Sequence, residues 1–249
     1  MLRLIRYVGA LYLLSFSMSA SAVEIRVACA ANFYPTLNAI KNQFEQSTEH
    51  KITIIRGSTG KLYAQITRGA PFDVFLSADS RRVEKLVEQG KSLDGKSYVY
   101  ATGQLSLWKP ESVSSQNIKE ILYEGSFKKL AIANPKTAPY GAASVEALKS
   151  MELYEEVKNK LVYGENISQT LQFVESGAAD LGFVSRSHVN NDIYWEVGDY
   201  MHKPINQNMI VIKHTKNPEI ASQFVKYILT PEIQQLIYEH GYAAQAKGS

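Results

Sequence analysis

Small neutral hydrogen-bond donors occupy four junctions at which a strand-like run passes into a helix-like run. The junctions are Ala30-Ala31-Asn32, Gly57-Ser58-Thr59-Gly60, Pro139-Tyr140-Gly141 and Asn166-Ile167-Ser168. A helix N-terminus offers unpaired backbone N–H groups and a partial positive charge, so it attracts anions. None of the four tips carries a lysine or arginine. The pattern predicts a socket for a small, fully ionised oxyanion, which is bound without being chemically changed.

Catalytic groups are missing beside these junctions. Ser58 lacks the G-x-S-x-G pattern of a nucleophile elbow, and Gly57–Gly60 lacks the upstream glycine and the Ser/Thr after the lysine that a phosphate loop needs. No pair of histidines has a zinc-ligand spacing. Asp73 and Asp79 flank a strand, and Asp79 looks like a helix start, so we interpret both as structural. We therefore expect no enzyme activity, no cofactor and no directly bound metal.

The first residues have the composition of a secretory signal peptide. Arg3 and Arg6 precede an apolar run over 7–16, and the segment ends in Ala20-Ser21-Ala22. A membrane-spanning helix needs about 20 apolar residues, which is roughly twice this run. We expect cleavage near Ala22, a mature chain of 227 residues (249 less 22), and a periplasmic location.

The charge balance excludes a nucleic-acid surface. Loss of Arg3 and Arg6 reduces the basic count from 27 to 25 against 24 acidic residues, a net charge of +1, and no basic stripe is present. The single cysteine, Cys29, cannot form an internal disulfide and lies in an apolar run, so we expect a small buried side chain. At 45% hydrophobic residues the chain can build a core without disulfides.

Strand-like runs alternate with amphipathic helix-like runs, which predicts an α/β fold of mostly parallel sheets flanked by helices. In the first of these units, residues 24–30 form a predicted strand, and Asn32 is expected to cap a helix through Phe44. A long strand-like stretch over 98–108 changes this pattern and predicts a crossing into a second lobe; 207–213 is part of the return. We expect lobe I to comprise 23–103 and 205–249, and lobe II to comprise 104–204. Ligands of open α/β sheets lie at the carboxyl ends of strands, so the cleft between the lobes would hold the anion and close on it.

Six segments, in order and at fitting spacing, closely resemble the periplasmic molybdate-binding proteins of ABC importers. The segments are 27–33, 57–66, 69–79, 131–141, 164–170 and 178–184. The resemblance covers almost the whole mature chain. It implies the two-lobed type II periplasmic-binding-protein fold, molybdate and tungstate as ligands, and an ABC permease in the inner membrane as partner. We expect a monomer.

The resemblance also implies particular ligand residues. By position they are Asn32, where many relatives have serine, Thr59 with Ser58 beside it, and the backbone N–H groups of Tyr140 and Ile167. We expect the ring of Tyr140 to cover the cleft, with a core position as the alternative.

Ser185 departs from the family pattern, because some relatives carry a tyrosine hydroxyl at that position. We expect Ser185 to fall short of the anion and the two N–H groups of the Asn32 amide to compensate.

Two other functions stay open at this stage. One is a receptor for sulfate, phosphate or an organic anion; the other is an exported protein without a transport role on the same scaffold, since fold alone does not define function. A carboxylate receptor would normally place an arginine in the cleft. Arg56, which precedes the second junction, is the candidate, and we expect it to point away.

Overall fold

The computed structural model of the protein describes residues 22–110, 112, 114–189 and 193–243. The expected signal peptide lies outside these residues, except for Ala22. Within the described part of the chain, no helix is both long and apolar enough to cross a membrane.

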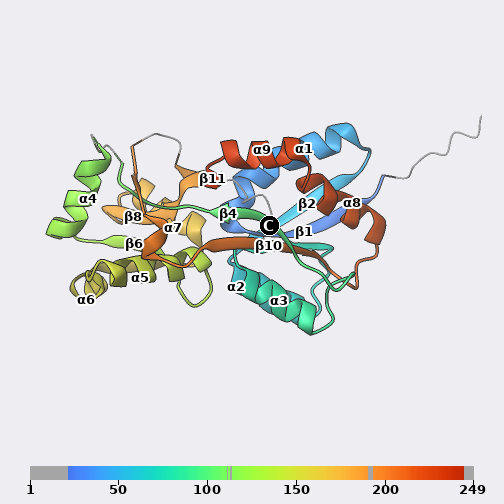
Figure 1. The fold of residues 1–249 in the computed structure, drawn as a ribbon, viewed down its shortest axis with the longest axis horizontal. Helices are drawn as coiled ribbons and strands as arrows, with labels where there is room; N and C mark the ends of the chain where they lie inside the picture. The colour runs from blue at the N-terminus through green and yellow to red at the C-terminus, as the bar shows by residue number, and fades with distance from the viewer. Residues whose placement is uncertain (1–21, 111, 113, 190–192, 244–249) are drawn as a thin grey trace, which may run out of the picture.

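Two sheets lie end to end along the long axis of the molecule (Figure 1). The first has the strand order β11-β4-β10-β3-β1-β2 and the second β7-β6-β8-β5-β9. The strands of the first sheet are β1 (Glu24–Ala30), β2 (Lys51–Gly57), β3 (Val74–Leu76), β4 (Tyr98–Gly103), β10 (Ile205–Val211) and β11 (Tyr242–Ala243). Those of the second are β5 (Leu105–Trp108), β6 (Leu130–Ala133), β7 (Leu161–Gly164), β8 (Leu181–Ser185) and β9 (Trp195–Glu196).

Both sheets are mixed. Parallel pairing joins β1 to β2 and β3, and β6 to β7 and β8; the remaining pairs are antiparallel. The reason is the crossing: β4 leads the chain out of the first sheet and β10 brings it back, so the two run in opposite directions and pair antiparallel.

The predicted crossing is two strands rather than one. Only Gln104 separates β4 from β5, yet these strands belong to different sheets. Gly103 ends β4 at a point where a Cβ atom would lie 2.2 Å from the hydroxyl of Tyr140, so only glycine fits there. The chain therefore changes sheets at a position where an element of the second sheet approaches the backbone of the first.

Helices cover both faces of the first sheet (Figure 1). Helices α1 (Tyr34–Ser47), α8 (Pro218–Ile228) and α9 (Pro231–Glu239) cover one face; α2 (Thr59–Thr67) and α3 (Ser80–Glu88) cover the other. Side chains of β1 point alternately to the two faces of the sheet and so contribute to both cores. Val27 and Cys29 pack toward α1, and Ala28 packs toward α2 and α3. Cys29 is fully buried, as predicted, and burial raises the pKa of its thiol.

The second sheet has the same layered construction. Its main core packs α4 (Ser115–Glu124) and α5 (Pro139–Ser150) against Leu107, Ile132 and Phe183, while α7 (Ile167–Glu175) packs Val174 against Ala131 on the other face. The short helix α6 (Tyr154–Val157) follows α5. The alternation of strands with helices that the sequence predicts is present along both sheets.

Candidate anion-binding site

All four junctions meet at one small cavity between the two sheets. Its volume is about 10 Å³, which is the room of roughly one water-sized probe. The first sheet contributes the ends of β1 and β2, and the second contributes the starts of α5 and α7. The lining residues are Ala30, Ala31, Asn32, Gly57, Ser58, Thr59, Ala78, Ala138, Pro139, Tyr140, Asn166 and Ile167. None carries a formal charge, as the sequence predicted for the four tips.

Asn32 lies in a short 3-10 turn, Ala31–Phe33, and not at the N-cap of α1. The expected cap is wrong because α1 begins later, at Tyr34, and has no side-chain cap. The buried amide instead donates from Nδ2 to Gln207 Oε1 at 2.9 Å and to the Tyr242 hydroxyl at 3.2 Å. Tertiary partners therefore orient this side chain.

Ser58 is buried, and its hydroxyl has no hydrogen-bond partner among the described residues. Ser58 is the N-cap residue of α2, but its side chain does not bond the first turn of the helix. The neighbouring Thr59 Oγ1 accepts from the Ala78 N–H at 3.1 Å, which leaves its own proton available. The Ser58 hydroxyl is therefore the one at this junction that has no partner in the described part of the chain, and Ser58 lines the cavity.

The third and fourth junctions offer backbone donors. Tyr140 follows Pro139 in the first turn of α5, and Ile167 is the first residue of α7. The first four N–H groups of a helix have no partner within it. Asn166 caps α7 by accepting from the Gln169 N–H at 3.1 Å, so its side chain serves the helix.

The ring of Tyr140 does not cover the cleft; it belongs to the buried core, which was the alternative expectation. Its hydroxyl lies 2.9 Å from Ser185 Oγ and 3.3 Å from Gln207 Nε2. Burial raises the pKa of this phenol, against the lowering effect of these hydrogen bonds. Ser185 is buried behind the site and does not line the cavity.

Gln207 and Tyr242 are the residues that sequence reasoning missed. Both are buried in the strands β10 and β11, and both hydrogen-bond Asn32. One signal was available for Gln207, because it alternates with the apolar Ile205 and Met209 along its strand, and a polar residue on an apolar face needs a buried partner. Nothing local marks Tyr242 as part of the site.

Charged residues surround the cavity without entering it. Arg56, which was expected to point away, is exposed and does not line the cavity, and its guanidinium lies 4.8 Å from the ring centroid of Tyr34. At the rim, Lys61 pairs with Glu165 at 2.8 Å, and the Gly60 N–H donates to the Thr137 carbonyl at 2.9 Å. These contacts join the first turn of α2 to the segments that follow β6 and β7 of the second sheet.

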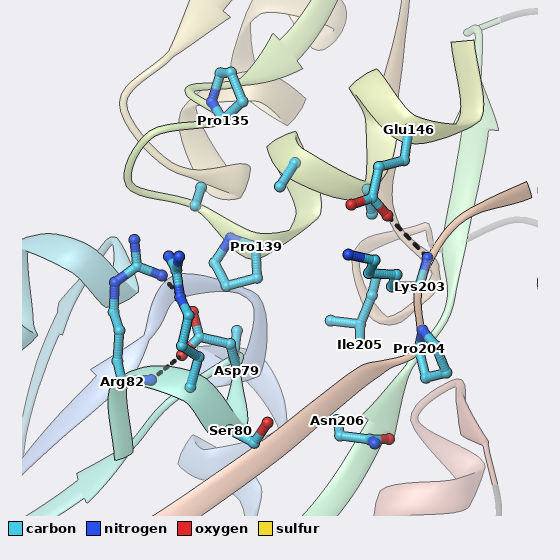
Figure 2. Close-up of a pocket in the computed structure, with 15 residues that line it drawn as sticks. Asp79, Ser80, Arg82, Pro135, Pro139, Glu146, Lys203, Pro204, Ile205 and Asn206 are labelled. Carbon is cyan, nitrogen blue, oxygen red and sulfur yellow. Dashed lines mark hydrogen bonds and ion pairs between the residues drawn. The ribbon is translucent and has the colours of Figure 1, made fainter. Parts of the chain in front are cut away.

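A second hollow of about 370 Å³ adjoins the cavity and shares Ala78, Ala138 and Pro139 with it. Figure 2 shows Arg82 paired with Asp79 on one wall and Glu146 reaching the backbone N–H of Lys203 on the other. Asp79 also caps α3, so its predicted structural role is confirmed. Asp73 is structural as well, because it accepts from the Arg26 N–H at 2.6 Å and from the Thr215 hydroxyl.

The fold and this neutral donor site define a class of protein. The chain belongs to the family of bacterial extracellular solute-binding proteins, whose family model matches residues 25–243.

Particular members of that family are also similar to it. It is 42% identical to the molybdate-binding protein ModA of Azotobacter vinelandii, over 91% of this chain and 92% of that protein. The corresponding protein of Rhodobacter capsulatus is 36% identical over 93% of each chain. The structure of the periplasmic molybdate-binding protein of A. vinelandii matches with a TM-score of 0.84 and 34% identity, covering 89% of this chain and all of that one.

Proposed function

We propose that this protein is an extracytoplasmic receptor that binds molybdate in the small cavity between the sheets and delivers it to an ABC permease in the inner membrane. Asn32, Ser58 and Thr59 hold the anion with their side chains, and Tyr140 and Ile167 hold it with backbone N–H groups. Relatives that match nine-tenths of the chain and are named for molybdate binding support the choice of ligand.

The observation that carries the proposal is the hydroxyl of Ser58, which has no partner among the described residues. It is buried in a cavity whose lining offers several donors and no charged side chain. Leaving a buried hydroxyl unpaired costs about 1–3 kcal/mol, and an oxygen of a bound oxyanion removes this cost. No general base, nucleophile or metal-ligand set is among the described residues that line the cavity, so the role is binding and not catalysis.

Protonation distinguishes molybdate from phosphate at such a site. Molybdate is a fully ionised dianion near pH 7 and only accepts hydrogen bonds, whereas phosphate keeps a proton that must find an acceptor. Backbone N–H groups cannot accept, and a mismatched buried donor costs about 1–3 kcal/mol. Tungstate has the same charge and tetrahedral shape as molybdate, so it binds as well. Sulfate carries no proton and is excluded only by its smaller size.

The two sheets correspond to two lobes that close on the anion. Lobe I comprises residues 23–103 and 205–249, and lobe II comprises 104–204. Two junctions come from each lobe, and the contacts between Gly60 and Thr137 and between Lys61 and Glu165 form on closure. The closed monomer, exported after cleavage near Ala22, presents both lobes to the permease.

Calorimetric titration of the purified protein tests the proposal. Molybdate and tungstate are expected to bind with one-to-one stoichiometry, and phosphate and glutamate are expected not to compete at equal concentration. No heat and no thermal shift at millimolar molybdate would refute the assignment of the ligand. Effective competition by phosphate would refute the preference for an anion that carries no proton.

A further inference from the structure

A buried chain of polar side chains crosses between the two sheets behind the cavity. It starts at Gln207, whose Nε2 donates to the Tyr140 hydroxyl at 3.3 Å. Ser185 Oγ lies 2.9 Å from that hydroxyl and 2.8 Å from Ser187 Oγ, which in turn donates to the backbone carbonyl of Asn32 at 3.2 Å. The chain therefore ends on the residue whose side-chain amide Gln207 also contacts.

The amide of Asn32 has its donor end turned toward the protein. Both N–H groups of Nδ2 are directed to protein acceptors, Gln207 Oε1 at 2.9 Å and the Tyr242 hydroxyl at 3.2 Å. The acceptor end of the planar amide, Oδ1, is then the end left for the cavity that Asn32 lines. A fully ionised oxyanion cannot donate to Oδ1, so Asn32 has to turn its amide by half a turn to bind one.

Asn32 can turn only if Gln207 turns with it. After the half-turn, Oδ1 of Asn32 faces Gln207, which must present Nε2 instead of Oε1. Gln207 Oε1 then accepts from the Tyr140 hydroxyl. The Tyr100 hydroxyl lies 3.0 Å from the Gln207 amide and 3.1 Å from the Ser77 carbonyl, so it can donate to the carbonyl and accept from Gln207. The Tyr242 hydroxyl, which donates to the Asn32 backbone carbonyl at 2.9 Å, then has to donate to Oδ1 instead, and the carbonyl keeps its hydrogen bond from Ser187. With that change every member of the network keeps a partner in this second arrangement.

We propose that Gln207 is the positioning residue of the anion site: its paired turning with Asn32 decides whether the cavity offers a donor or an acceptor. With Nε2 toward Asn32, the cavity receives an N–H group and suits an oxyanion without a proton. With Oε1 toward Asn32, it receives a carbonyl oxygen and suits an oxyanion that carries one. Gln207 thereby acts on anion selectivity from a position outside the cavity lining. The inference rests on the proposed function and deepens it.

Substitution of Gln207 separates this role from packing and from charge. The ionised carboxylate that Gln207→Glu introduces has only acceptors, so it holds Asn32 in the arrangement that offers Oδ1 to the cavity. The probes are molybdate and hydrogen arsenate at pH 8 and pH 9.5. Both are dianions, so repulsion by the added charge cancels in the ratio of their affinities. We expect Gln207→Glu to lower the ratio of the molybdate affinity to the arsenate affinity by roughly tenfold or more. The reason is that Oδ1 of Asn32 then faces the anion, where it repels an oxygen of molybdate but accepts the proton of hydrogen arsenate.

Two further variants complete the experiment. Gln207→Met removes both polar ends without adding an ionisable group, so Asn32 loses its Gln207 partner in either arrangement. We expect the affinities for both ions to fall by about two- to tenfold, with their ratio nearly unchanged. If the carboxyl introduced by Gln207→Glu stays neutral or that variant does not fold, the orientation of the two amides in the molybdate complex decides the point. Gln235→Glu adds the same charge on the exposed face of α9, and its ratio should equal that of the unmodified protein.

The outcomes separate this inference from the proposed function. If the unmodified protein does not bind molybdate, the proposed function fails. If it binds molybdate but an ionised Gln207→Glu weakens the two ions equally, or Gln207→Met weakens neither ion, the positioning role is overturned. Neutron diffraction from the molybdate complex gives a direct readout. We expect Asn32 Nδ2 to face the anion and Gln207 Nε2 to face Asn32, and the opposite orientation would overturn the inference.

Discussion

Replacing Ser58 with alanine should weaken molybdate binding without destabilising the protein. The side chain makes no hydrogen bond with the described residues and does not cap α2, so its loss removes no hydrogen bond from the described part of the free protein. The buried hydroxyl is itself a cost, and Ser58→Ala should leave the free energy of unfolding unchanged or raise it by about 1 kcal/mol. In the complex the hydroxyl donates to an anion. Such bonds contribute about 1.5–3 kcal/mol, so the affinity should fall roughly tenfold to a hundredfold.

Ser106→Ala is the matched control. Ser106 Oγ is likewise buried and without a partner among the described residues, but it lies in β5 and does not line the cavity. Both variants should melt within a few degrees of the unmodified protein in the absence of ligand. Saturating molybdate should then stabilise Ser106→Ala as much as the unmodified protein, by about 2.7 kcal/mol at a hundredfold excess over Kd. Ser58→Ala should gain less at the same concentration, and titration calorimetry gives the affinities directly.

Two results would refute the reasoning. An unchanged affinity in Ser58→Ala would mean that the hydroxyl does not contact the anion. A large loss of stability in the free protein would mean that the hydroxyl has a structural partner, for example an ordered water, and that the binding loss follows from misfolding.

Three further substitutions test other parts of the protein. Asn32→Ala should weaken molybdate binding roughly tenfold to a hundredfold, since it removes a hydrogen bond to a charged ligand; a titration that gives the native affinity would exclude Asn32 as a ligand. Gly60→Ala places a Cβ atom 3.0 Å from Thr137 Cα and should hinder closure, which would weaken binding by roughly tenfold with little change in melting temperature; equal affinity would show that the lobes need not approach so closely. Burial lowers the pKa of His188 to about 4, below its unfolded value of about 6.5. Between these two pH values the unfolded chain binds one more proton than the folded protein at this residue. The free energy of unfolding therefore falls as the pH drops from about 6.5 toward about 4. Urea unfolding should show a loss of about 2 kcal/mol from this residue between pH 7 and pH 5, and His188→Gln should lose less over the same range.

The local sequence was sufficient to predict the elements and the four junctions. Apolar residues alternate along β1 and recur every three or four residues along α1. Both patterns can be read from a short segment of the chain, and they predict which side chains are buried. The neutral character of the cavity could be predicted for the same reason, because the residues at each strand-to-helix junction come from one short segment. The buried Cys29 and the cap formed by Asp79 were likewise local properties.

Only the tertiary structure decided which donors are free and which are already bonded. Asn32 was expected to cap a helix, but its amide is bonded by Gln207 and Tyr242, which lie more than 170 positions further along the chain. Tyr140 was expected over the cleft, yet Gly103 leaves space for its hydroxyl to reach the first sheet. These contacts depend on β10 and β11 pairing with β4, a non-local arrangement that no residue spacing encodes. The sequence by itself therefore determined where the donors lie, and the packing of distant strands decided how each one is oriented.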